Sequence, residues 1–144
     1  MESHRLATAG YDVVNIDTFE AAIEKSKATV EKLFSRKVAK GSMTEEKKAE
    51  ILGRLTYSQN FEDVKGAFLV VEAVPEKIEI KKDTFKKVDE LADAETIIVS
   101  NTSGLSISEI ASVTNRPDQG PCVIKRLRGC GSGNEYVAIT PDGD

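Results

Sequence analysis

Metal-ligating side chains are scarce in this chain. Its 144 residues include two cysteines, one histidine and no tryptophan. Cys122 and Cys130 lie near the C-terminus and the histidine is residue 4, so the three make no plausible zinc-binding set. We therefore expect no metal site and interpret both cysteines as free thiols. We expect His4 to be solvent-exposed on a frayed helix rather than to act as a base.

An excess of positive charge and long apolar segments are also missing. The chain has 20 Lys and Arg and 24 Asp and Glu, which gives a net charge of −4. This charge argues against a nucleic-acid partner. Every apolar run is of strand length, so none is expected to cross a membrane, and "MESHRLATAGYDV" has no apolar stretch of signal-peptide length. We expect a cytoplasmic protein, with an organelle matrix as the alternative.

A glycine-rich phosphate turn is lacking near the start of the chain. No G-x-G-x-x-G occurs there, and the one glycine-dense stretch, "RGCGSGNE" at 128–135, neither follows a strong strand nor opens a helix. We interpret that stretch as a loop.

What the sequence does contain is an alternation of strands and helices. Apolar, β-branched runs predict strands at 11–17, 54–58, 68–74 and 96–100. Three- and four-residue spacings predict a helical hairpin at about 18–53, a short helix at 60–67, a helix at 76–92 and one after Ser106. Strands that are apolar on both faces and alternate with helices indicate a mostly parallel sheet covered on both sides.

Polar residues gather where three of these strands end, which is where ligands bind in such sheets. Asp17 follows the first strand, at the position where a dinucleotide-binding fold carries a ribose-binding acid; alternatively it caps the next helix with Glu20 as a capping box. Glu72 lies inside an apolar run and needs a buried partner. Glu76 is either a site residue or a first-turn acid of the next helix.

Two further features at this edge have an ordinary structural interpretation. Lys81, taken alone, is one of several lysines on a charged helix face. The "SNTS" stretch at 100–103 is either a ligand floor or a turn that satisfies its own backbone.

Three segments together closely resemble the NAD-binding domain of L-3-hydroxyacyl-CoA dehydrogenases, including 3-hydroxybutyryl-CoA dehydrogenase. They are "ATAGYDVVNID", "VVEAVPEKIEIKKDTFKKVDELA" and "IIVSNTSGLSISEIASVTNRPD". The likeness runs from about residue 4 to 118, and the joint occurrence of "EAVPE" and "SNTSGLSI" is its specific part. It implies a Rossmann-type doubly wound α/β fold with an inserted helical hairpin.

The resemblance also implies roles for single residues. Asp17 corresponds to the acid that holds the adenosine ribose of NAD, and Glu76 and Lys81 match positions that contact the cofactor. Ser103 matches a residue that hydrogen-bonds the substrate oxygen beside the nicotinamide. On the substrate side, Asn101 falls in the same stretch, and Lys40 lies near where the family binds coenzyme A. The implied partners are an acyl-CoA and, in the full-length family, a second copy of the chain.

This sequence departs from the family pattern at both ends. The resemblance implies a first strand with a Gly-rich turn before "ESHRLATAGYD", and a strand with a catalytic histidine after "NRPD"; neither is matched here. We therefore divide the chain into a partial NAD-binding domain at 1–118 and a divergent tail at 119–144. Loss of a central strand predicts exposed strand edges and a poorly stable monomer. Residues 121–127, "PCVIKRL", are a candidate substitute strand.

Two alternatives to an NAD-dependent enzyme fragment stay open. One is a non-catalytic relative that serves as a structural or self-associating protein. The other is a crystallin-like hydroxyacid dehydrogenase acting on a sugar acid. A basic pocket around Lys37 and Lys40 would favour coenzyme A over the sugar acid.

Overall fold

The computed structural model describes residues 3–102, 104–116, 122–123 and 135–140. The strands are β1 (Asp12–Ile16), β2 (Leu55–Ser58), β3 (Leu69–Ala73), β4 (Ile97–Ser100), β5 (Cys122–Val123) and β6 (Glu135–Thr140). The helices are α1 (Ser3–Thr8), α2 (Glu20–Ala39), α3 (Glu45–Gly53), α4 (Ile78–Leu91) and α5 (Ile107–Ala111), with a 3-10 turn, η1 (Phe61–Val64). Within the described residues, no helix is both long and apolar enough to cross a membrane.

Local side-chain chemistry accounts for the helix ends. The Thr44 hydroxyl accepts a hydrogen bond from the Lys47 N–H at 3.1 Å, and the Ser106 hydroxyl accepts one from the Glu109 N–H at 3.3 Å. These bonds satisfy N–H groups that the first turn leaves without helical partners. α2 ends at Ala39, and Gly41, just past the Lys40 C-cap, has a φ of +72° that suits glycine. The predicted caps of α3 and α5 are thus confirmed.

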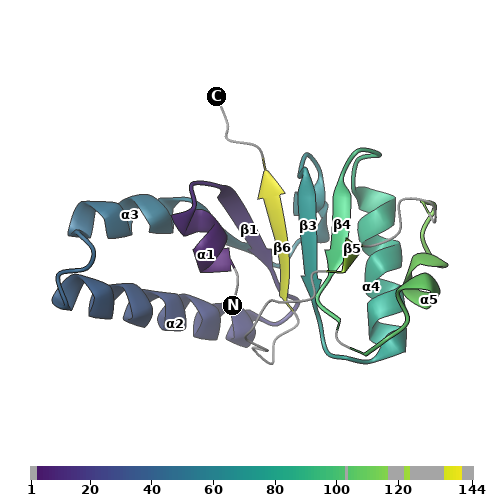
Figure 1. Cartoon of the computed structure of the whole chain (residues 1–144), viewed down its shortest axis with the longest axis horizontal. Helices are drawn as coiled ribbons and strands as arrows, with labels where there is room; N and C mark the ends of the chain where they lie inside the picture. Colours follow the sequence, from purple (N-terminus) through teal and green to yellow (C-terminus); the bar gives the residue numbers. More distant parts are fainter. Residues whose placement is uncertain (1–2, 103, 117–121, 124–134, 141–144) are drawn as a thin grey trace.

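The strands form one six-stranded sheet in the order β2-β1-β6-β3-β4-β5 (Figure 1). The β1–β2, β3–β4 and β4–β5 pairs are parallel, as predicted for an α/β sheet. A doubly wound sheet commonly has the order 3-2-1-4-5-6, in which the first strand lies between the second and the fourth. In this chain that central place is taken by β6.

β6 runs antiparallel to both of its neighbours. Val14 and Val70 each lie opposite Ala138, and Val13 and Leu69 each lie opposite Ile139. The expectation of exposed edges at the centre of the sheet is therefore wrong, because β6 pairs with β1 and β3 along their whole lengths. The candidate substitute at 121–127 is also wrong: its described part, β5, pairs with β4 at the margin of the sheet.

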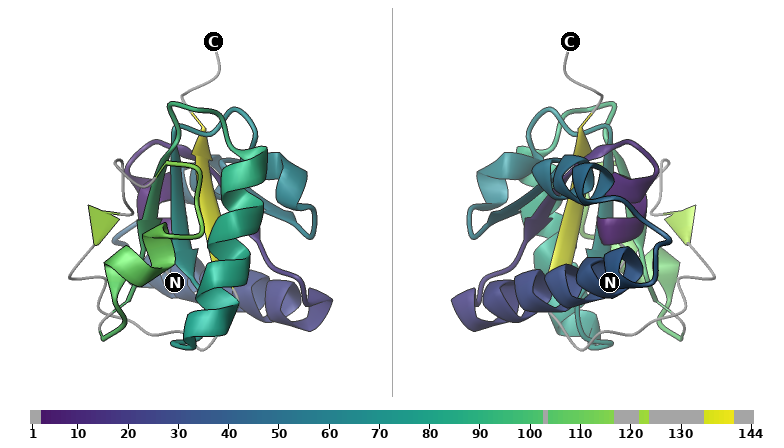
Figure 2. Two further views of the ribbon diagram at one scale, coloured as in Figure 1. Left: turned by 90° about the vertical axis from the view of Figure 1, so that its right-hand side faces the viewer. Right: turned by 90° about the vertical axis from the view of Figure 1, so that its left-hand side faces the viewer.

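Helices cover both faces of the sheet (Figures 1 and 2). α1, α2 and α3 supply Ala7, Val30, Phe34 and Ile51 to a core that includes Ile139. On the other face η1, α4 and α5 contribute to a core that includes Ala138. Neighbouring residues of β6 thus enter opposite cores, as expected from the two-residue repeat of a strand. The protein therefore has an α/β fold with a mixed sheet, in which β6 runs antiparallel to both of its neighbours.

The prediction that His4 is solvent-exposed is wrong. It is half-buried on α1, and its ring meets Phe34 of α2 edge-on at 6.3 Å between centroids. Burial, followed by the nearby positive charges of the N-terminal amine, Arg5 and Lys37, lowers the pKa of His4 below its ordinary 6.5. No local pattern in the sequence signals this contact, because it joins two helices that lie before and after β1 in the chain.

Candidate cofactor site at the carboxyl edge of the sheet

The carboxyl ends of β1, β3 and β4 meet at one edge of the sheet, at the bottom of Figure 1. The parallel register places Glu72 of β3 opposite Ser100 of β4. Asp17 follows the end of β1. This is the edge at which open α/β sheets bind their ligands.

Asp17 is buried, with 1% of its surface exposed. Its Oδ1 accepts a hydrogen bond from the Phe19 N–H at 2.9 Å, and its Oδ2 has no hydrogen-bond partner among the described residues. The helix begins only at Glu20 with Phe19 as N-cap, so the capping-box interpretation is wrong. Burial raises the pKa of Asp17 above its ordinary 3.8, against the lowering effect of backbone N–H groups. A buried acceptor is thus left available for a ligand donor.

Glu72 has the buried partner that its place in an apolar strand required. The Lys81 ammonium donates to both carboxylate oxygens, at 2.8 and 3.1 Å, and the Ser100 hydroxyl donates to Oε2 at 2.6 Å. All three residues are at most 1% exposed. The interpretation of Lys81 as part of a solvated lysine face is therefore wrong. Its spacing to Phe85 and Val88, four and seven residues on, could have placed it on the buried face of α4.

Glu76 joins the turns that follow β3 and β4. Its Oε1 accepts hydrogen bonds from the Thr102 hydroxyl and from the Gly104 N–H, the latter at 3.1 Å. Its Oε2 lies 3.6 Å from the Lys81 Nζ. Thr102 is a contact that the sequence interpretation did not single out. Thr102 is thus held by an acid 26 residues earlier in the chain, from outside its own turn.

The remaining predicted site residues are distributed unevenly. Asn101 lies at this edge, half-buried, and its N–H donates to the Glu72 carbonyl at 2.8 Å. Ser103 lies outside the described residues. Lys40 is exposed at the far end of α2, a helix of 20 residues and hence about 30 Å long. The structure therefore places Asp17, Glu76, Lys81 and Asn101 at the same edge of the sheet, with β6 between the strands of Asp17 and Glu76, and places Lys40 away from it.

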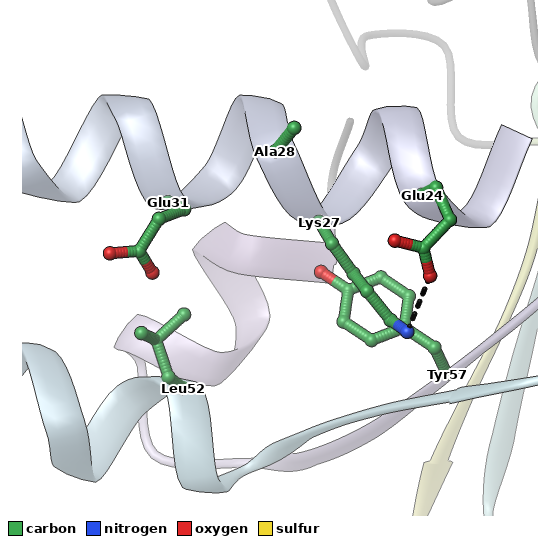
Figure 3. Close-up of a pocket in the computed structure, with 6 residues that line it drawn as sticks. All are labelled: Glu24, Lys27, Ala28, Glu31, Leu52 and Tyr57. Atoms are coloured by element: carbon green, nitrogen blue, oxygen red, sulfur yellow. Dashed lines mark hydrogen bonds and ion pairs between the residues drawn. The ribbon is translucent and has the colours of Figure 1, made fainter.

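A pocket of about 440 Å³ lies elsewhere, between α2, α3 and β2 (Figure 3). Leu52, Ala28 and the Tyr57 ring line it together with Glu24, Lys27 and Glu31. The Lys27 ammonium is paired with Glu24 at 2.9 Å and lies 5.5 Å from the Tyr57 ring centroid. No predicted site residue lines this pocket. The polar cluster at the carboxyl edge is chemically the better candidate site.

Comparison with known proteins decides the family. The profile described as "3-hydroxyacyl-CoA dehydrogenase, NAD binding domain" matches residues 3–124. The chain belongs to the 3-hydroxyacyl-CoA dehydrogenase family. It is 44% identical over 113 residues to the 3-hydroxybutyryl-CoA dehydrogenase of Clostridioides difficile, covering 78% of this chain and 40% of that protein. It is 38% identical over 120 residues to human mitochondrial hydroxyacyl-coenzyme A dehydrogenase, covering 78% and 38%.

A solved dehydrogenase structure supports the same assignment. The (S)-3-hydroxybutyryl-CoA dehydrogenase of Ralstonia eutropha aligns with a TM-score of 0.77 at 36% identity, over 81% of this chain and 41% of that chain. The chain thus spans about 40% of the length of the dehydrogenases it matches. It corresponds to the NAD-binding domain of the 3-hydroxyacyl-CoA dehydrogenase family.

Proposed function

We propose that this chain binds NAD at the carboxyl edge of its sheet, as the cofactor-binding part of a 3-hydroxyacyl-CoA dehydrogenase. The observation that carries the proposal is the buried Oδ2 of Asp17, which has no partner among the described residues. An unmade hydrogen bond on a buried acceptor is costly, and a ribose hydroxyl would satisfy it. The residues present therefore fit the nucleoside end of NAD.

When bound, NAD would supply the group that takes a hydride from C3 of a 3-hydroxyacyl-CoA, or returns it, in the parent reaction. The chain's own residues would bind NAD and the substrate and orient them. Asp17 would accept hydrogen bonds from the ribose hydroxyls. Glu76, which follows β3, and Lys81, in the first turn of α4, would contact the cofactor, as the family resemblance implies. Ser103 and Asn101 orient the substrate oxygen, as the family resemblance implies. Lys40, beyond the C-terminal end of α2, would contact the coenzyme A part, as the family resemblance implies.

We also propose that this chain alone has little dehydrogenase activity. The general base implied by the family is a histidine, and the only histidine in the sequence is His4, which packs against Phe34. The Gly-rich phosphate turn has no counterpart at the start of the sequence, so NAD affinity should be weak. An acyl-CoA partner, a dimer in the full-length protein and a cytoplasmic or organelle-matrix location are further parts of the proposal.

Titrating NADH into the 144-residue chain and, separately, into its Asp17→Asn variant tests the proposed binding. We expect measurable binding that falls on the order of 10- to 100-fold in the variant, because an ionised acceptor is lost. Because burial raises the pKa of Asp17, binding should also decline with acidification at pH values above 3.8. Asp83→Asn, on the exposed face of α4, is the matched control.

Three results would contradict the proposal. Equal NADH affinity in the wild type and Asp17→Asn would remove Asp17 from the site. Ordinary turnover of acetoacetyl-CoA with NADH would show that the chain is not inactive. Defined self-association with no nucleotide binding would instead favour the structural alternative.

A further inference from the structure

The pocket between α2, α3 and β2 lies apart from the proposed cofactor site (Figure 3). Its volume of about 440 Å³ suits a small molecule. Small-molecule sites occupy roughly 300–1,000 Å³ and combine an apolar lining with a few polar groups. Both features are present here, in three apolar and three charged groups: Leu52, Ala28, the Tyr57 ring, Glu24, Glu31 and Lys27.

The pocket uses a different face of α2 from the predicted coenzyme A contact. Its α2 residues, at positions 24, 27, 28 and 31, recur at three- and four-residue spacing and therefore share one side of the helix. Lys40 comes nine residues after Glu31, which is about half a turn further round a helix of 3.6 residues per turn. The pocket is therefore not the proposed acyl-CoA contact.

The Tyr57 ring already has a cation over its face. The Lys27 ammonium lies 5.5 Å from the ring centroid, within the roughly 6 Å at which an aromatic face attracts a positive charge. The same ammonium is 2.9 Å from Glu24 Oε1, and Figure 3 shows the Lys27 side chain running across the ring to reach it. Because Lys27 is 48% exposed and a surface ion pair of this kind adds little stability, Lys27 can move into solvent at low cost.

A second acceptor lies at the other end of the pocket. Glu31 of α2 and Leu52 of α3 face each other there (Figure 3). The Lys48 ammonium and the Ser35 hydroxyl both donate to Glu31 Oε1, at 2.5 and 3.5 Å. Among the described residues Oε2 is therefore left for a further donor. With two carboxylates and one ammonium, the lining residues carry one more negative charge than positive.

We propose that this pocket binds a small protonated amine with an apolar body. The ligand's ammonium replaces that of Lys27 over the Tyr57 ring, and its body packs against Leu52 and Ala28. An ammonium has three donors, which match the acceptors of Glu24 and Glu31, whereas an anion would face two carboxylates. The proposal does not rest on NAD binding.

Three probes that share one ring and differ in charge test the ligand class. Benzylamine, benzyl alcohol and benzoate are titrated separately into the 144-residue chain at pH 7, and amide resonances are followed by NMR. We expect benzylamine to shift the resonances of Tyr57 and Leu52 with a Kd on the order of 1 mM, as suits so small a ligand. Benzoate should bind about tenfold more weakly or worse, since it loses the attraction to the ring and the carboxylates. Equal affinities of the three probes would overturn the proposal.

Two exposed side chains test the geometry without threatening the fold. Lys27→Met removes the competing ammonium, so benzylamine should bind about threefold more tightly or better. Glu31→Gln removes an acceptor charge and should weaken benzylamine binding by about threefold to tenfold. Lys25→Met, at an exposed α2 lysine that does not line the pocket, is the matched control and should change nothing. Weaker binding in Lys27→Met would show that the ligand does not take the place of Lys27.

The outcome is independent of the proposed function. If the chain binds no NADH, NAD binding is refuted while the benzylamine titration still decides the role of this pocket. If benzylamine at concentrations on the order of 10 mM gives no saturating shift at Tyr57 and Leu52, the amine site is refuted whatever the NADH affinity.

Discussion

Buried polar side chains in this domain are of two kinds. Glu72, Lys81 and Ser100 satisfy one another in a closed set of hydrogen bonds. Asp17 and His4 instead each keep a buried polar atom without a partner among the described residues. The satisfied groups hold the local backbone and side chains in one arrangement. An unpartnered buried atom instead costs free energy, which other folding interactions or a bound ligand must offset. In both unpartnered groups burial is the main cause of the pKa shift, and each shift disfavours the charged form.

His4 should make stability depend on pH. Its pKa is lowered in the folded state, so the unfolded chain binds a proton that the folded chain releases. Stability is therefore expected to fall as pH drops below 6.5 toward the lowered pKa. His4→Leu should reduce this slope when urea unfolding is measured between about pH 5 and pH 7.5, a range that spans the ordinary pKa of histidine. An identical slope in the variant would show that other groups control the dependence.

Most individual elements could be predicted from the sequence, because their signals are local. The apolar runs of β1, β3 and β4 and the caps Thr44 and Ser106 lie within the elements they define. The role of Asp17 is harder to predict from the sequence, since the same acid is typical of both a helix cap and a ligand site. β6 could not be assigned to the sheet centre, because its pairing with β1 joins residues at least 120 positions apart and no local pattern encodes strand direction.

The contribution of β6 to the core can be measured with one residue. Ile139 is 1% exposed and packs in the core that also holds Phe34 and Ile51. Ile139→Ala should lower the free energy of unfolding by about 2–5 kcal/mol, because it leaves a cavity between sheet and helices. Ile97→Ala, at a strand residue 55% exposed, is the control and should cost well under about 1 kcal/mol. Equal losses at the two sites, measured in urea, would argue that β6 is not seated in the core.

At the scale of the whole molecule, β6 joins two halves that are otherwise separate in the sheet. β1 and β2 form one pair and β3, β4 and β5 form the other group, and in the described sheet only β6 bonds to both. The family comparison extends to residue 124 and does not reach β6. The integrity of the domain therefore depends on a segment outside the matched region.

Removal of this segment should change the state of association. A chain ending at residue 134 would leave β1 and β3 with unpaired inner edges, which are templates for pairing with other chains. We expect the full chain to sediment as a single species at micromolar concentration and the shortened chain to form larger species with loss of cooperative unfolding. A shortened chain that remained monomeric and cooperative would show that the two halves hold together without β6.

The position of β6 also has a consequence for synthesis on the ribosome. β6 leaves the ribosome about 40 residues after β4, and translation adds roughly 5–20 residues per second. For about 2–8 seconds, β1 through β4 are available while the strand that links them is not. During that interval the nascent chain has two open edges facing each other. Chaperone binding to this nascent chain should therefore peak before residues 135–140 emerge.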